Sequence, residues 1–237
     1  MSALAQLAGN DLRTLYRSGY IWVSLAVFGL MLVVALQASR LDFAGYERFI
    51  AAVILFDVVL SPLMLVGLMV LLERGEGAFA VLCVSPAPTP AYIVARVLTV
   101  SLISLAQTLV IVLVVYDGAL SPLALTAGLA GAASLSALFG FVIIAYFDDL
   151  YAYLFPMIGA IMALGVPGYG VLLGIAPEWL AWHPTAGALV LIETAFSLDA
   201  PQGPARASAS LAAWILAAGG LAYLAVRRMR ARIGGAS

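Results

Sequence analysis

The chain has 237 residues, of which 65% are hydrophobic and 10% charged, and its formal net charge at pH 7 is −1. Soluble domains contain about 45–50% apolar and about 25% charged residues, and a chain of this length has too much surface to hide such an excess from water. The composition excludes a soluble enzyme, a disordered tail and a disulfide scaffold, gives no electrostatic basis for nucleic-acid binding, and predicts an all-α integral membrane protein.

Residues 1–18 are expected to form an amphipathic helix. Their leucines recur on one face at helical spacing, and Arg13 and Arg17 lie on the other face. This pattern predicts an interfacial helix that lies under the bilayer and touches a cytoplasmic partner. The alternative is a plain basic anchor that leads into the first membrane span.

Six apolar stretches are long enough to cross the bilayer as helices, since a hydrocarbon core about 30 Å thick requires about 20 residues. Helices are favoured over a barrel because the runs are long and do not alternate. Pro167 is expected to distort the end of the fifth stretch. The approximate boundaries are residues 20–38, 49–72, 91–116, 120–147, 151–175 and 208–226.

Arginine is the only basic residue type apart from one histidine, and its distribution predicts the orientation. If the N-terminus is inside, the outer segments hold only Arg40, Arg48 and Arg206, and the other eight arginines are inside. The positive-inside rule therefore predicts a multi-pass protein of the cell membrane with both termini in the cytoplasm. The basic tail, residues 227–237, would lie on the inner side.

Polar residues within the second and third spans are candidates for a substrate path. Asp57 should face protein or water, because a charge at the bilayer centre costs about 2.5–3.5 kcal/mol. It is either a path or gating group, or a structural hydrogen bond or protonated carboxyl between helices. Ser104, Gln107 and Thr108 share part of the third span and either line a cavity or bond to neighbouring helices.

The inner loop, residues 73–90, has a specific pattern. Charged residues end the second span, glycines break the helix, and a short apolar helix containing Phe79 and Leu82 follows before Pro86. An apolar helix outside the bilayer either folds against its own spans or inserts into a groove of another protein. The residues alone favour neither alternative.

The fourth span and the outer segment after the fifth span also carry informative patterns. The fourth span carries Gly128, Ala132, Ser136 and Gly140 at i, i+4 spacing, which predicts close helix packing. The outer segment, residues 176–207, contains an apolar stretch too short to span the bilayer. Its single histidine, His183, is expected to be a capping or interface residue.

The inner loop resembles the first cytoplasmic loop of ABC type-2 permeases, the membrane subunits of one class of ATP-driven exporters. The resemblance covers most of the chain in architecture, but only residues 73–96 at the level of a motif. It is closest to small permeases of the fluoroquinolone-export type. Family members often have Lys where Arg96 stands and a less proline-rich turn. The residues that carry it are Glu73-Arg74-Gly75-Glu76-Gly77, Leu82, Val84-Ser85-Pro86, Tyr92, Ala95 and Arg96.

The resemblance implies that residues 73–90 form a coupling loop, whose short apolar helix Ala78–Val84 docks onto an ATPase subunit. It further implies that the outer segment 176–207 dips back into the membrane. The coupling contacts would be Glu73, Arg74, Glu76, Phe79, Leu82 and Pro86.

The implied function is that of a permease subunit that moves an amphipathic or apolar small molecule, drug-like or lipid-like, across the inner membrane. The sequence has no G-x-x-x-x-G-K-[ST] motif and no lysine to complete one. The chain is therefore expected to be non-catalytic and without cofactor or metal, with ATP and Mg²⁺ in a separate nucleotide-binding subunit. A second copy or a sister permease would complete the pathway. The alternatives are an ion-coupled secondary carrier and a non-transporting scaffold or assembly factor.

Overall fold

The computed structural model describes residues 16–17, 19–41, 45–79, 81, 88–172, 175, 178–198 and 203–234. Within these ranges all regular structure is helical, so the predicted all-α fold is confirmed for the described part of the chain. The predicted interfacial helix lies almost wholly outside these ranges, as do Leu82 and Pro86 of the inner loop.

Four helices are long and apolar enough to cross a membrane. They are α3 (Tyr46–Gly75), α5 (Thr89–Val115), α6 (Pro122–Ile144) and α10 (Pro204–Gly234). Further helices are α2 (Tyr20–Ser39), α7 (Leu150–Leu164), α8 (Val166–Leu172), the 3-10 helix η1 (Glu178–Trp182) and α9 (Ala186–Ala195). The four long helices α3, α5, α6 and α10 correspond to the predicted second, third, fourth and sixth spans. The count of six crossings stays a prediction.

The fifth apolar stretch is divided into α7 and α8 at Gly165. The division lies two residues before Pro167, whose ring nitrogen has no hydrogen to donate to the carbonyl four residues earlier. The amide of Gly165 still bonds to the Ile161 carbonyl at 2.9 Å, so α7 is regular up to its end. The predicted distortion therefore takes the form of a helix break.

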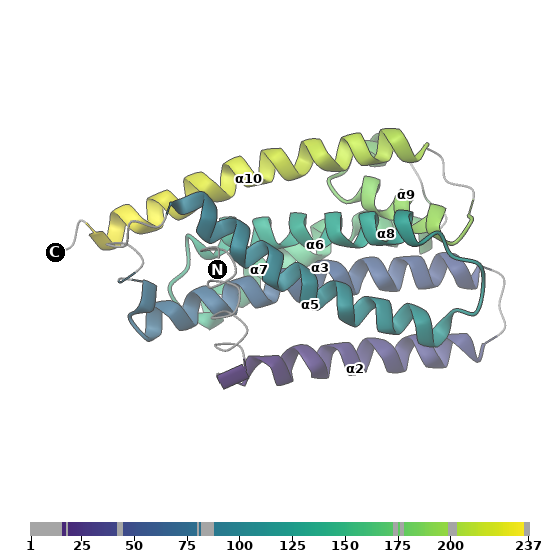
Figure 1. Ribbon diagram of the computed structural model, residues 1–237, viewed down its shortest axis with the longest axis horizontal. Helices are drawn as coiled ribbons and strands as arrows, with labels where there is room; N and C mark the ends of the chain where they lie inside the picture. The colour runs from purple at the N-terminus through teal and green to yellow at the C-terminus, as the bar shows by residue number, and fades with distance from the viewer. Residues whose placement is uncertain are drawn as a thin grey trace.

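The long helices run side by side along the molecule, with two distinct ends (Figure 1). At one end α2 and α5 begin and α3 and α10 terminate; we call this the arginine end, after Arg74, Arg96, Arg228 and Arg230. At the opposite end α9 lies between α6 and α10 as a short helix that does not continue through the bundle.

α3 is the central helix. It packs against α2, α5, α6, α7, α8 and α9, and its side chains are buried along most of its length. This burial follows from an apolar sequence on all faces of the helix. α7 approaches α3 so closely that the ring of Tyr153 occupies the space a side chain on Gly67 would need, and its hydroxyl donates to the Leu63 carbonyl at 2.7 Å.

The row of small residues on α6 lies at two close helix contacts. A Cβ on Gly128 would lie 3.0 Å from the Ala188 carbonyl oxygen of α9, and one on Gly140 would lie 3.1 Å from the Leu63 carbonyl oxygen of α3. Ala132 and Ser136 between them are fully buried. The absence of large side chains on this face thus allows α6 to approach both neighbours.

Candidate functional site

The last turn of α3 connects the bundle to the inner loop. Glu73 and Arg74 are adjacent there, and successive helical residues point about 100° apart, so the two side chains reach different neighbours. Glu73 binds α5, and Arg74 binds the end of α6 and the turn after it. The point where the loop leaves α3 is therefore fixed to two other helices.

Glu73 forms a charged cluster with α5. One carboxylate oxygen accepts a hydrogen bond from the Tyr92 hydroxyl at 2.7 Å, and the other pairs with the guanidinium of Arg96. The Arg96 side chain is only 2% exposed and lies over the Tyr92 ring, 5.4 Å from its centroid. A cation buried this deeply requires a well-placed carboxylate.

Arg74 donates to carbonyl groups at the end of α6. Its Nη1 donates to the Phe147 carbonyl at 2.8 Å and its Nη2 to the Ile144 carbonyl at 3.2 Å. The Ile144 carbonyl lies at the C-terminal end of α6, where the helix carries a partial negative charge, so a guanidinium is favourable there. Arg74 also pairs with Asp148 at 3.0 Å, but that carboxylate is 96% exposed and the pair itself contributes little.

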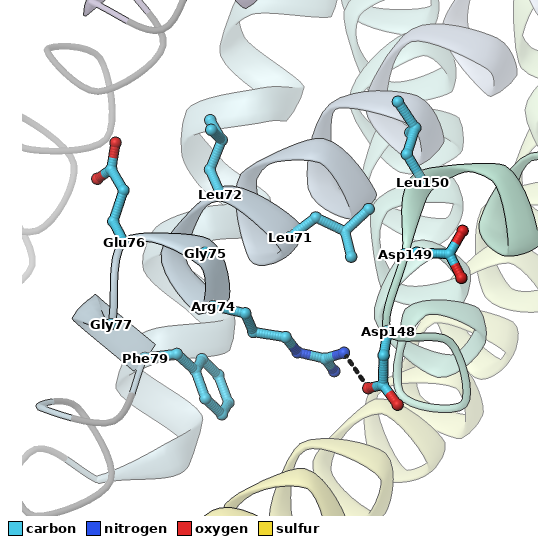
Figure 2. Close-up of a pocket in the computed structure, with 10 residues that line it drawn as sticks. All are labelled: Leu71, Leu72, Arg74, Gly75, Glu76, Gly77, Phe79, Asp148, Asp149 and Leu150. Carbon is cyan, nitrogen blue, oxygen red and sulfur yellow. Dashed lines mark hydrogen bonds and ion pairs between the residues drawn. The ribbon is translucent and has the colours of Figure 1, made fainter.

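A pocket of about 610 Å³ lies between the end of α3 and the turn joining α6 to α7. Figure 2 shows Arg74 reaching across it toward Asp148. The neighbouring Asp149 has a different role: its carboxylate accepts a hydrogen bond from the Ala152 amide at 2.9 Å and caps the start of α7. The lining residues are Leu71, Leu72, Arg74, Gly75, Glu76, Gly77, Phe79, Asp148, Asp149 and Leu150.

The described part of the predicted coupling helix points in two directions. Phe79 is 1% exposed and packs edge-on against Tyr92, with ring centroids 6.2 Å apart, and beneath the Arg74 guanidinium. Val81, two residues later, is 68% exposed, and Glu76 is also exposed. The segment is thus held to its own bundle by Phe79 while other side chains face outward.

The predicted path residues are only partly brought together. Asp57, Ser104 and Thr108 are almost completely buried between α3 and α5, and the Thr108 hydroxyl lies 2.7 Å from Asp57 Oδ2. Gln107 instead pairs with Ser24 of α2, with its amide nitrogen 2.9 Å from the Ser24 hydroxyl. Ser24 was not anticipated from the sequence, although a lone polar residue in an apolar helix is a signal for such a partner.

His183 lies at the opposite end of the bundle. Its Nδ1 is 3.1 Å from the Thr185 hydroxyl, which itself donates to the Leu164 carbonyl at 2.6 Å. Burial lowers the pKa of His183, an effect opposed in part by a hydrogen bond from its ring to the backbone of Ala163. This arrangement connects the start of α9 to the end of α7.

The sequence matches the model of one protein family over residues 12–227. That family is described as "Fluoroquinolones export permease protein Rv2686c-like". The match includes the Glu73–Arg74 anchor, the buried Asp57 cluster and the helices that carry them. No curated protein gives a significant match to the chain.

Proposed function

The chain belongs to the Rv2686c-like family of fluoroquinolone export permeases, and we propose that it is the membrane subunit of an exporter driven by a separate ATPase. Membership of this family makes it a multi-pass membrane transport protein. A separate ATPase as the energy source is what we propose beyond membership of the family. It is supported by a sequence that lacks a phosphate-binding loop and any lysine to complete one.

The observation that carries the proposal is the double anchorage of the inner loop at its root. Glu73 holds α5 and Arg74 holds the end of α6, so a force on residues 73–90 would act on three helices together. In the proposed cycle, closure of two ATPase subunits moves this loop and tilts α3 and α5. Coupling of this kind requires contacts that differ between the two states.

The complete assembly follows from the same proposal. Six crossings, with α7 and α8 together as the fifth, would put both termini on one side of the membrane, and the arginine distribution favours the cytoplasm for that side. Two permease chains, either identical or sister subunits, form the path, and the ATPase subunits hold ATP and Mg²⁺. The cargo is an amphipathic or apolar small molecule, and the family description favours fluoroquinolone-like drugs over lipids.

Co-purification tests the coupling loop directly. The substitution Leu82→Asp is expected to abolish association with the proposed ATPase subunit, because it places a charge on the apolar face of the predicted coupling helix. Leu41→Asp is the matched control, since Leu41 is 64% exposed and lies just after the end of α2 at Ser39, away from the arginine end where α2 begins. Recovery of the Leu82→Asp complex at the wild-type yield would reject the loop as the docking element.

Two functional assays separate the alternatives. Transport that survives removal of the ATPase but stops with an uncoupler would identify an ion-coupled carrier. A reconstituted complex without any stimulated ATPase activity would identify a scaffold or assembly factor.

A further inference from the structure

The hydroxyl of Thr108 lies between two oxygen atoms. Its Oγ1 is 2.7 Å from Asp57 Oδ2 and 2.9 Å from the Ser104 carbonyl oxygen. Both are hydrogen-bond distances, but a threonine hydroxyl has only one proton to donate. If Asp57 were ionised, both neighbours would be acceptors, and one short oxygen–oxygen contact would have no proton of its own.

The second proton has one available source. A protonated Asp57 carboxyl can donate to Thr108 Oγ1, and Thr108 can then donate to the Ser104 carbonyl, its usual acceptor one turn earlier in the helix. Every short contact in the cluster is then a hydrogen bond. A separate proton for each of the two short contacts thus needs one proton from the Thr108 hydroxyl and one from the carboxyl group.

The charges around Asp57 are consistent with a proton on its carboxyl group. On α3 the nearest cation in the sequence is Arg48, nine residues away, or about 13 Å along the helix. The one charged residue of α5 is Arg96, twelve residues from Thr108 and paired with Glu73. A carboxylate that is 1% exposed and lacks a cation is far more costly to bury than a neutral acid.

The remaining elements packed on α3 add no positive charge. The sequence of α6 contains no ionisable side chain, and the described side chains of α2 include none. The ionisable groups on α7, α8 and α9 are Tyr151, Tyr153, Tyr169 and Glu193, none of which is a cation. The ionisable groups on these elements thus supply no cation that would stabilise an ionised Asp57.

We propose that Asp57 is a buried proton-binding site, held as a neutral carboxylic acid at pH 7 that donates to Thr108. The relay from Asp57 through Thr108 to the Ser104 carbonyl joins α3 to α5 within the membrane-spanning region. Ser61, one turn further along α3, and the Ser104 hydroxyl are also buried and have no hydrogen-bond partner among the described residues. They extend a polar seam between the two helices toward the arginine end.

Separation of α3 from α5 would expose this site. It would remove the acceptor from Asp57 and admit water, and both changes favour loss of the proton. A change in the distance between the helices is therefore linked to proton release. The protonation state of Asp57 in the packed bundle does not depend on the proposed ATPase partner, so the two proposals fail independently.

Infrared spectroscopy of the purified full chain at pH 7 tests the site. The carbonyl stretch of a neutral carboxylic acid is expected in the wild type and absent in Asp57→Asn. Thr108→Val should move this band to higher frequency, because the acid loses its acceptor, and Thr108→Ser should leave it in place. The matched control is Ser136→Ala, which removes another buried hydroxyl that bonds to its own helix, at 2.8 Å from the Ala132 carbonyl, but to no carboxyl group.

Several results would overturn the proposal. A wild-type spectrum without the band would show that Asp57 is ionised. A band that persists in Asp57→Asn and disappears in Glu193→Gln would assign the neutral acid to Glu193 instead. A band assigned to Asp57 that does not move in Thr108→Val would reject the relay. If Asp57→Asn does not fold, the response to the two Thr108 substitutions decides between the same outcomes.

Discussion

Two acidic side chains of α3 bind α5, and they do so through different chemistry. At the arginine end, Glu73 meets the cation Arg96 and the hydroxyl of Tyr92. In the middle of the same helix pair, Asp57 meets the hydroxyl of Thr108 and no cation. The difference lies in the partner: Glu73 meets a buried cation and a hydroxyl, whereas Asp57 meets a hydroxyl and, in the proposal above, carries a proton of its own.

The comparison also predicts which contact between the helices is easier to break. Truncating one member of a buried ion pair leaves the other charge without compensation, whereas truncating a neutral hydrogen bond leaves only an unsatisfied dipole. Breaking the buried pair of Glu73 and Arg96 should therefore cost more stability than breaking the contact between Asp57 and Thr108.

The largest effect is expected from Glu73→Ala, which leaves Arg96 buried without its carboxylate. The free energy of unfolding should fall by about 3–5 kcal/mol. Denaturant-induced unfolding of the purified protein in mixed micelles measures it, with Glu76→Ala as the control because Glu76 is exposed. A loss no larger than that of Glu76→Ala would show that the pair with Arg96 contributes nothing.

A smaller effect is expected from Arg74→Ala. This change removes charge-assisted hydrogen bonds to the Ile144 carbonyl at the end of α6 and to the Phe147 carbonyl in the turn after it, each worth about 1.5–3 kcal/mol. Because water can replace part of the guanidinium at this end, we expect a net loss of about 2 kcal/mol. Faster hydrogen exchange at the end of α6 and the following turn should accompany it, and unchanged exchange there would contradict the capping role.

Thr108→Val tests the contact between Asp57 and Thr108, which contains no cation. It should lower the free energy of unfolding by about 1–2 kcal/mol, because the Asp57 proton loses its acceptor in a buried site. Ser136→Ala serves again as the control in the same unfolding assay. A loss equal to that of Glu73→Ala would contradict the distinction between the ionic and neutral contacts.

The smallest effect is expected from Asp148→Ala. Its carboxylate is 96% exposed, so its pair with Arg74 should contribute less than about 1 kcal/mol. Raising the salt concentration should abolish even this difference, because exposed charges are screened. A salt-insensitive loss of several kcal/mol would place Asp148 in the structural core of the site.

Much of the fold could be predicted from the sequence because it depends on local quantities. Uninterrupted apolar length predicts the four long helices α3, α5, α6 and α10. Within α6, a Cβ on Gly128 or Gly140 would lie close to a backbone carbonyl of a neighbouring helix. The division at Gly165 was harder to place, since a proline indicates a distortion but not whether the helix bends or breaks.

The partners of individual polar residues could not be predicted in the same way. Gln107 and Thr108 are adjacent, yet one binds α2 and the other α3. The choice depends on the rotation of α5 relative to two neighbours, which no spacing within α5 specifies. Phe79 presents the same difficulty, because its burial against Tyr92 depends on how the chain turns after Gly77, where φ is +73°.

The central claim is that a separate ATPase drives this permease through the loop at the arginine end. Uptake of a fluoroquinolone into inside-out vesicles that contain the permease and its ATPase tests it most directly. We predict accumulation that requires hydrolysable ATP, is lost in Leu82→Asp and is retained in Leu41→Asp. Accumulation that proceeds at the same rate without ATP, or that is unaffected by Leu82→Asp, would contradict the account.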